Sequence, residues 1–169
     1  KYMKKSDKKI GKEKTNVMRV LDAKKIAYNS YEYEAGETAP SGGEVASMLG
    51  LDPSRVFKTL VTVGASKEHY VFMVPVLQEL DLKKAAKAAG EKSIEMIKSK
   101  ELLPLTGYVH GGCSPIGMKK QFTTFADTSA EGFGTIYFSA GRIGHQVELP
   151  PKELVKLVGL RFADICVEK

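Results

Sequence analysis

From residue 15 onward, apolar and polar positions follow patterns that predict short helices and strands in an irregular order. Four segments combine apolar residues at helical spacing with a capping side chain or a proline at the start. These segments are residues 15–25, 43–50, 81–90 and 151–159. Gly50 and Gly90 stand where two of these helices should end, because glycine readily adopts the left-handed conformation that terminates a helix.

Alternating and β-rich runs predict the strands. These runs are residues 27–34, 56–64, 68–76, 121–127, 134–141, 145–149 and 162–167. The second and third runs are joined by the short stretch GASK, which predicts an antiparallel hairpin. A further strand-rich block is expected to begin near residue 107. Because strands predominate and no strand–helix–strand alternation is sustained, we expect an α+β fold with a mixed or largely antiparallel sheet.

The positive charge of the chain is concentrated at its start. The 169 residues carry a formal net charge of +6, but residues 1–14 alone hold seven lysines against Asp7 and Glu13. The rest of the chain carries 19 basic and 18 acidic groups. Residues 1–14 are therefore expected to be a basic, disordered and solvated tail, which could add affinity for phosphate groups. Residues 15–169 are long enough for a single domain with a sizeable core.

Cysteine usage and hydropathy indicate the compartment. Cys113 and Cys166 show no repeated spacing, so no disulfide framework is expected. No apolar signal segment opens the sequence, and no run approaches the roughly 18 consecutive apolar residues of a membrane helix. We therefore expect a cytoplasmic protein without a membrane partner.

The segment RVFKTL, residues 55–60, places a lysine in a run that otherwise favours burial. Strand alternation puts Lys58 on one face with Val56 and Leu60, and Phe57 on the opposite face. In a core the ammonium would need a partner, because burying an unpaired charge is costly, whereas in a cleft it could bind an anion. The pattern also fits an exposed edge strand, where lysine discourages pairing with other chains.

The segment GYVHGGCSPIGMKK, residues 107–120, is rich in glycine around Ser114 and Pro115. Glycine permits close approaches and unusual backbone conformations, so a loop of this kind can aim N–H groups at a phosphate or a developing oxyanion. An ordinary turn explains the same composition. The spacing differs from that of a Walker loop.

Other combinations of reactive residues give weaker signals. The glycine-punctuated turn within 138–149 carries Arg142 and His145, which could meet a phosphate or simply belong to a hairpin turn. His110 and Cys113 have a spacing compatible with metal binding, but no further ligands lie nearby in sequence, so we expect no metal. Cys113 could also be a nucleophile, although an unreactive thiol is the simpler explanation.

Five segments together resemble, in order and spacing, those of the YbaK/EbsC family of aminoacyl-tRNA deacylases. The segments are RVFKTL, DLKKAAKAAG, GYVHGGCSPIGMKK, TIYFSAGRIGHQVEL and LVGLRFADI. The resemblance extends over the whole chain except the basic tail. It implies a compact α+β domain with a mixed, largely antiparallel, barrel-like sheet flanked by helices. Such a domain is related to the editing domain inserted in bacterial prolyl-tRNA synthetases, and it uses no cofactor.

The resemblance also implies roles for individual side chains. Lys58 matches the family's essential lysine and would hold a phosphate or ribose oxygen of the substrate, an ester between an amino acid and the terminal adenosine of tRNA. Tyr33 falls where the family has a tyrosine against the substrate. Gly141 and Gln146 belong to the last glycine turn and complete the expected binding set. The family's glycine–proline loop, expected to cradle the oxyanion of the ester, corresponds to Gly111, Gly112, Cys113, Ser114, Pro115 and Gly117.

Two positions depart from the family pattern. Cys113 replaces an apolar residue and would face or flank the pocket. Gln146 stands where some relatives have a polar or acidic residue, so an acidic role at this position is in doubt, although the amide can still donate a hydrogen bond.

The predicted function is that of a trans-acting deacylase that removes cysteine wrongly attached to proline tRNA. The resemblance implies that the thiol of the bound cysteine attacks its own carbonyl, so positioning supplies much of the rate enhancement. Two main alternatives stay open: the same reaction on another small amino acid such as alanine, with water as the nucleophile, or a non-catalytic tRNA-binding or regulatory module. The expected partners are aminoacyl-tRNA and prolyl-tRNA synthetase, because a near-neutral domain should hold free tRNA weakly.

Overall fold

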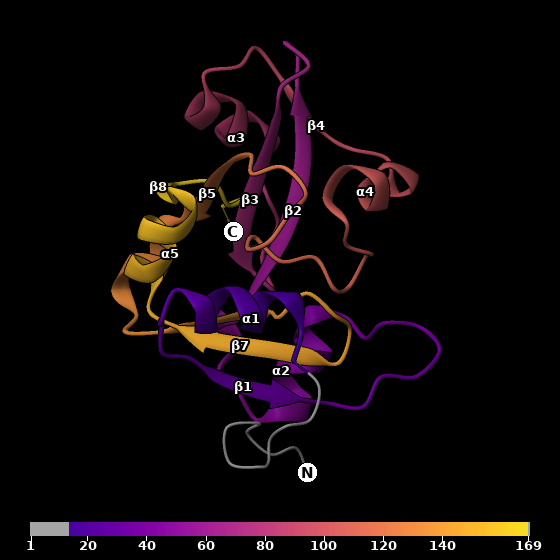
Figure 1. Ribbon diagram of the computed structural model, residues 1–169. Coiled ribbons are helices and arrows are strands. Elements are labelled where there is room, and N and C mark those ends of the chain that lie inside the picture. The colour runs from indigo at the N-terminus through magenta and orange to yellow at the C-terminus, as the bar shows by residue number, and fades with distance from the viewer. Residues whose placement is uncertain (1–13, 169) are drawn as a thin grey trace.

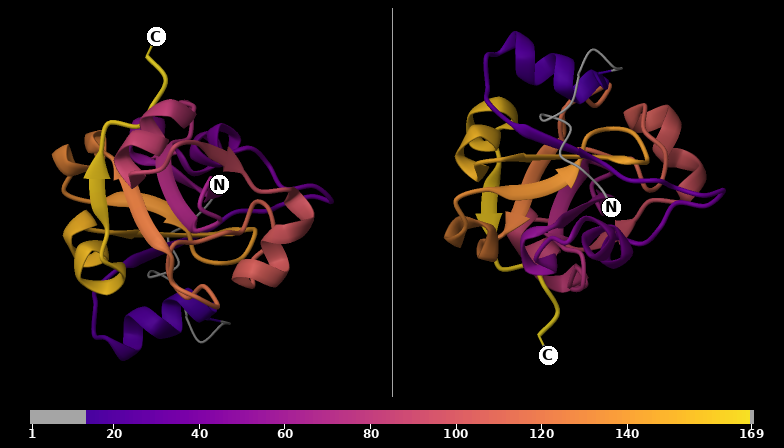
Figure 2. Two further views of the ribbon diagram at one scale, coloured as in Figure 1. Left: turned by 90° about the horizontal axis from the view of Figure 1, so that it is seen from above. Right: turned by 90° about the horizontal axis from the view of Figure 1, so that it is seen from below.

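The computed structural model describes residues 14–168, which form two β-sheets and five short α-helices (Figures 1 and 2). The strands are β1 (Asn29–Glu32), β2 (Phe57–Gly64), β3 (His69–Pro75), β4 (Ile94–Met96), β5 (Thr123–Asp127), β6 (Ile136–Ser139), β7 (His145–Leu149) and β8 (Arg161–Ala163). The helices are α1 (Asn16–Ala23), α2 (Gly42–Leu49), α3 (Leu82–Ala89), α4 (Ser99–Thr106) and α5 (Pro151–Val158), with 3-10 turns η2 (Pro53–Arg55) and η3 (Thr128–Gly132). No helix in this part of the chain has the length and apolar character needed to cross a bilayer.

The predicted helix signals act as expected in α1, α2 and α3. Thr15, Ser41 and Asp81 each accept a hydrogen bond from a backbone N–H of the first turn. Gly50 and Gly90, with φ of 68° and 75°, end α2 and α3 in the left-handed conformation. Each cap satisfies backbone groups that a helix end otherwise leaves without partners, so these eight-residue helices have defined ends.

The predicted hairpin forms the centre of a five-stranded sheet with the order β4-β2-β3-β5-β8. β2 and β3 pair antiparallel from Phe57–Pro75 to Val63–His69. β4 pairs antiparallel with only the far end of β2, opposite residues 62–64. β5 is parallel to β3, and β8 is parallel to β5. The sheet is therefore mixed, and the expected α+β class is confirmed.

The antiparallel sheet β1-β7-β6 lies across one end of this hairpin. In Figure 1, β1 and β7 run crosswise to β2 and β3, and α1 lies over β7. A bridge between Val56 and Tyr137 joins the two sheets. The largest apolar cluster unites α1, β2 and β6, whose members Val17, Phe57 and Phe138 are buried. A second cluster packs α3 against the other side of the hairpin.

Some expectations about secondary structure are wrong. Residues 107–112 form turns rather than the start of a strand-rich block. α4 and the three-residue β4 lie where no element was expected. The last strand ends at Ala163, and beyond it only an isolated bridge pairs Leu80 with Cys166.

The expected tail falls almost entirely on residues 1–13, which lie outside the described residues. Lys14, which was assigned to that tail, forms an ion pair with Asp22 of α1 at 2.5 Å. The extent of the domain is otherwise untested and stays a prediction.

A partly buried carboxylate ties the three-stranded sheet to the start of β2. Glu148 of β7 accepts hydrogen bonds from Tyr31 Oη at 2.6 Å, Thr135 Oγ1 at 2.5 Å and Asn29 Nδ2 at 3.1 Å. Arg55, just before β2, lies 3.6 Å from the same carboxylate and also donates two hydrogen bonds to the Thr135 carbonyl. The network fixes the entry of β2 relative to β1, β6 and β7.

Candidate functional site

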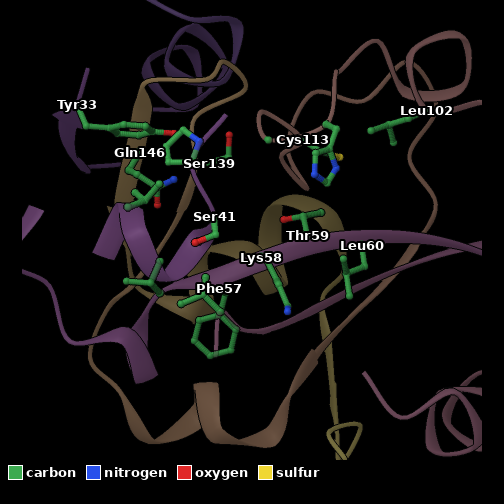
Figure 3. Close-up of a pocket in the computed structure, with 17 residues that line it drawn as sticks. Tyr33, Ser41, Phe57, Lys58, Thr59, Leu60, Leu102, Cys113, Ser139 and Gln146 are labelled. Atoms are coloured by element: carbon green, nitrogen blue, oxygen red, sulfur yellow. The ribbon is translucent and has the colours of Figure 1, made fainter. Parts of the chain in front are cut away.

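A pocket of about 190 Å³ lies where the two sheets meet. Figure 3 shows its walls, with Tyr33 and Gln146 on one side and Cys113 and Leu102 on the other, while residues 57–60 of β2 lie beneath them. The complete lining is Tyr33, Pro40, Ser41, Gly42, Val45, Val56, Phe57, Lys58, Thr59, Leu60, Val76, Leu102, His110, Gly111, Cys113, Ser139 and Gln146. Five stretches of the sequence thus converge on one space: residues 33–45, 56–60, 76, 102–113 and 139–146.

The first wall is the open edge of β2. The backbone N–H of Val76 donates to Val56 and that of Gly64 to Glu68, both at 2.8 Å, so even-numbered residues of β2 bond to β3. In an antiparallel ladder the residues between them point to the opposite edge. Because β4 pairs only with residues 62–64, the backbone groups of Thr59 face an edge that no strand covers. The pocket lies along this edge.

Lys58 lines the pocket, but its amine does not approach the glycine loop. Its backbone pairs opposite Val74, and its side chain lies on the face of β2 opposite to that of Thr59. Figure 3 shows the amine directed away from Cys113 and Gln146. Lys58 is half-buried, and it forms no ion pair with another residue between 14 and 168. The sequence thus places a cation at the rim of the pocket that no described acidic group neutralises.

Glycines in the loop after α4 allow three segments to pack together. Gly111 has φ of 89°, and a Cβ on it would come within 2.6 Å of the Cβ of Ala39. A Cβ on Gly112 would meet the backbone nitrogen of Ile143 at 3.0 Å. The loop is therefore fitted between the loop before α2 and the β6–β7 turn, and any side chain at Gly111 would strain it.

The thiol of Cys113 is a poor nucleophile in this environment. Its side chain is 8% exposed, and burial raises the pKa of the thiol from 9.0 to about 12. At neutral pH the thiol therefore stays protonated, and only the thiolate is strongly nucleophilic. Among residues 14–168, no cluster of three or more His, Cys, Asp or Glu side chains could hold a metal ion.

Tyr33 and Gln146 form the opposite wall and are both 7% exposed. The Tyr33 backbone N–H donates to the carbonyl of Gly144 at 2.9 Å, which holds the chain after β1 against the β6–β7 turn. Burial raises the pKa of the Tyr33 hydroxyl, so it is neutral at physiological pH and can donate a hydrogen bond. Gln146 lies on β7, opposite Tyr31 on β1 and Ser139 on β6.

Two buried polar atoms in the pocket have no hydrogen-bond partner. They are the Thr59 hydroxyl oxygen, Oγ1, and the Gln146 amide oxygen, Oε1. Leaving a buried hydroxyl or amide unpaired costs about 1–3 kcal/mol, so native proteins seldom retain such groups without a function. Both atoms belong to residues that line the pocket, where water or a polar ligand can complete their hydrogen bonds.

The structure does not bring all the predicted site residues to the pocket. Lys58, Tyr33, Gly111, Cys113 and Gln146 line it. The other predicted members of the loop and turn do not; these are Gly112, Ser114, Pro115, Gly117 and Gly141.

Two of these glycines allow the chain to pack closely against Tyr108. Gly117 and Gly141 have φ of 81° and 95° and approach the Tyr108 ring or hydroxyl. Tyr108 in turn donates a hydrogen bond to the carbonyl of Ile116 at 2.5 Å. These contacts hold the loop that carries Gly111 and Cys113.

Sequence reasoning missed several polar groups of the pocket. Thr59 follows Lys58 directly, and strand alternation could have pointed to it as the residue of the opposite face. Ser41 was identified only as a helix cap, a role that it fills by accepting a hydrogen bond from the Glu44 backbone. His110 and Ser139 also line the pocket, and no spacing in the sequence distinguished them for this role.

Residues 37–157 match the family model of the aminoacyl-tRNA editing domain. The chain belongs to this family. The resemblance seen in the sequence is thereby confirmed, and so is the enzyme class, because an aminoacyl-tRNA editing domain is an ester-hydrolysing domain.

Individual editing-domain relatives agree with this assignment. The chain is 46% identical to the "Putative Cys-tRNA(Pro)/Cys-tRNA(Cys) deacylase EbsC" of Enterococcus faecalis over 162 residues, which are 96% of this chain and 99% of that protein. It is 30% identical to the proline–tRNA ligase of Pelobacter propionicus over 97 residues, which are 57% of this chain but 17% of the ligase. A solved structure described as "a putative trans-editing enzyme for prolyl tRNA synthetase" superposes with a TM-score of 0.74 at 25% identity, covering 90% of this chain and 97% of that one.

Proposed function

We propose that this editing domain acts in trans as a deacylase that removes cysteine from mischarged proline tRNA. The observation that carries the proposal is the pocket itself, in which the unpartnered oxygens of Thr59 and Gln146 lie near the rim lysine, Lys58. The name of the Enterococcus faecalis relative supports cysteinyl-tRNA as the substrate class.

The size of the pocket suits an aminoacyl group rather than a whole nucleotide. A volume of about 190 Å³ corresponds to roughly six water molecules in the liquid. The cysteinyl group also has six non-hydrogen atoms. The acyl group would occupy the pocket, and the terminal adenosine would lie at its mouth along the open edge of β2.

Lys58 would hold the tRNA side of the ester. The pocket borders the edge of β2, so a long side chain can reach it from either face of the strand. Rotation about the bonds of the flexible four-carbon stem would bring the ammonium to a ribose or phosphate oxygen. The Thr59 hydroxyl and backbone groups, together with the Gln146 amide, would then orient the aminoacyl part.

The substrate would supply its own nucleophile. The cysteine thiol loses its proton and attacks the ester carbonyl, forming a C–S bond. The intermediate then breaks the C–O bond to the ribose, and the departing ribose oxygen takes up a proton. The cyclic thioester that results is opened by water to give free cysteine. Intramolecular attack needs only positioning and stabilisation of the oxyanion, and Cys113, a protonated thiol, is not required.

A panel of charged tRNAs tests the substrate. We expect rapid deacylation of cysteinyl-tRNA and little loss of alanine or serine, because neither carries a thiol. Rapid loss of alanine would instead show that water is the nucleophile, and stability of every ester would identify a binding module. Lys58→Ala should reduce turnover at least 100-fold while changing the free energy of unfolding by less than about 0.5 kcal/mol, since Lys58 has no described ion pair to lose.

A blocked thiol tests the mechanism separately from the substrate. S-methylcysteinyl-tRNA has nearly the same shape but cannot form the cyclic thioester, so it should be stable in the presence of the enzyme. Hydrolysis of this substrate at the rate of cysteinyl-tRNA would disprove attack by the substrate thiol while leaving the deacylase assignment intact.

Selectivity for proline tRNA would come from prolyl-tRNA synthetase. The Enterococcus faecalis relative is named for both proline and cysteine tRNAs, and a proline–tRNA ligase is similar to this domain. We therefore expect the isolated chain to deacylate cysteine from both tRNAs. Addition of the synthetase should raise the preference for proline tRNA; equal rates with and without it would contradict this partnership.

A further inference from the structure

Two of the segments that supply residues to the pocket differ in charge, although their charged residues lie outside the lining. Residues 26–54, which supply Tyr33, Ser41 and Gly42 to the lining, hold five acidic residues and no lysine or arginine. Residues 98–120, which supply Leu102 and the glycine loop, hold four lysines and one acidic residue, Glu101. The positive charge of residues 98–120 is thus not matched in the segment 26–54.

The four lysines are all exposed and belong to two adjoining segments. They are Lys98, Lys100, Lys119 and Lys120, which we call the α4 basic face. The two segments are in contact, because the Lys119 amine donates to the carbonyl of Pro104 in α4 at 3.3 Å and its backbone N–H donates to Thr106 at 3.0 Å. In Figures 1 and 2, α4 and the loop before α2 project on the same side of the molecule.

The single acidic side chain in this segment is already engaged. Glu101 Oε1 accepts a hydrogen bond from the backbone N–H of Lys98 at 2.9 Å, where α4 begins. None of the four lysines forms an ion pair with another residue in the range 14–168. The segment 98–120 therefore keeps a net charge of +3, four lysines against Glu101, next to a pocket wall.

We infer that the α4 basic face binds the phosphates of the single-stranded 3′ end of the tRNA and fixes the direction in which the ester enters the pocket. The inference rests on the proposed function. Phosphates are attracted to the lysines and repelled by the acidic segment 26–54, whereas the α-ammonium of the aminoacyl group is attracted to that segment. The two ends of the substrate carry opposite charges, so only one orientation matches the protein.

A pair of charge-matched triple variants tests this inference. The first is Lys98→Gln/Lys100→Gln/Lys120→Gln; Lys119 is kept because its amine bonds to α4. The control is Lys83→Gln/Lys87→Gln/Lys152→Gln, which removes three exposed lysines from α3 and α5. Figure 1 shows α3 and α4 on opposite sides of the β2–β3 hairpin. Both variants lose the same net charge, and residues 1–13 are identical in all three proteins.

Binding is measured by fluorescence anisotropy with an RNA hairpin that carries no amino acid and ends in single-stranded CCA. The measurement is repeated at about 50–300 mM KCl, because the salt dependence of the binding constant reports the number of phosphate contacts. The α4 triple variant should bind about tenfold more weakly. The slope of log K against log salt should fall by roughly 2, at about 0.7 per lost phosphate contact to a single strand. The control should stay within about twofold of the wild type. Equal losses in the two triple variants would overturn the inference.

Activity gives the second readout. On cysteinyl-tRNA, KM should rise about tenfold in the α4 triple variant with kcat unchanged, whereas a cysteinyl ester of adenosine without phosphates should be cleaved at the wild-type rate. An equal loss on the phosphate-free ester would mean that these lysines affect chemistry or folding, and would refute the inference. If the wild type cleaves neither ester, the proposed function fails. The anisotropy measurements alone then decide whether the α4 basic face binds RNA.

Discussion

Replacing Glu148 is expected to loosen the junction between the two sheets without touching the pocket lining. Its side chain is 13% exposed and receives hydrogen bonds from β1 and from Thr135, with Arg55 at 3.6 Å. In Glu148→Ala, the Tyr31 hydroxyl loses its hydrogen-bond acceptor and the Arg55 guanidinium loses its ion-pair partner. In Glu148→Gln, the shape and some of the hydrogen bonds remain, but the charge does not.

The magnitude follows from the number and burial of these contacts. A hydrogen bond to a charged group contributes about 1.5–3 kcal/mol; the cost of breaking a fully buried ion pair, about 3–5 kcal/mol, is an upper bound here because Arg55 and Glu148 are only partly buried. The contacts share one carboxylate and are not additive. We expect Glu148→Ala to lower the free energy of unfolding by about 3–4 kcal/mol and Glu148→Gln by about 1–2 kcal/mol. For a domain of this size, 3 kcal/mol corresponds to a fall in Tm of roughly 6–12 °C.

Urea denaturation at several pH values provides the assay. Burial alone would raise the pKa of Glu148, but hydrogen bonds from Thr135, Tyr31 and Asn29 together with Arg55 outweigh it and hold the pKa below its ordinary value of 4.5. The contribution to stability is therefore complete above about pH 4.5 and is lost as the pH falls through the lowered pKa of the folded state. The difference between wild type and Glu148→Gln should shrink accordingly below pH 4.5.

A glutamate on α5 supplies the matched control. Glu153 forms an i,i+3 ion pair with exposed Lys156 at 3.9 Å, so Glu153→Gln should cost less than about 0.5 kcal/mol. If Glu148→Ala costs no more than Glu153→Gln, the network does not hold the sheets together and the reasoning is wrong.

Three further predictions concern the pocket. Thr59→Val removes a buried hydroxyl that has no partner, so urea denaturation should show unchanged or higher stability while the deacylation rate falls; a loss of stability above 1 kcal/mol would show that the hydroxyl is satisfied. Gly111→Ala should cost about 1–3 kcal/mol because of its positive φ and the contact with Ala39, and it should lower kcat; wild-type stability would contradict this packing. Cys113→Ser should keep the deacylation rate within about threefold, since the thiol is protonated, and an inactive but folded variant would make the thiol catalytic.

Local signals carried much of the fold prediction, because they depend on neighbouring residues. The capping residues Thr15 and Asp81 and the GASK turn act through hydrogen bonds a few residues away, and each lies where the pattern indicated. The sequence pattern did not predict α4, because Pro104 lies in its interior and cannot donate the usual helical hydrogen bond. Three residues of β4 are too few to show alternation.

The site was less predictable than the fold, because it depends on contacts between distant segments. The family resemblance pointed to Lys58, Tyr33 and Gln146, and all three line the pocket. It could not show that the Lys58 amine points away from the loop, since that follows from the pairing of β2 with β3. Nor could it separate Gly111, which lines the pocket, from Gly117 and Gly141, which pack against Tyr108.

The short length of β4 has a consequence for engineering. The carbonyl of Val61 still accepts a bond from Ile97, at 3.4 Å, but the hydrogen bond between Glu101 and the Lys98 backbone then turns the chain into α4. Two more paired residues would carry β4 alongside Thr59. Such an extension should raise thermal stability by completing the ladder, and it should abolish turnover by filling the space that we propose for the ester. The early end of β4 therefore leaves the edge of β2 accessible, and variants selected only for higher stability would be expected to cover that edge and lose activity.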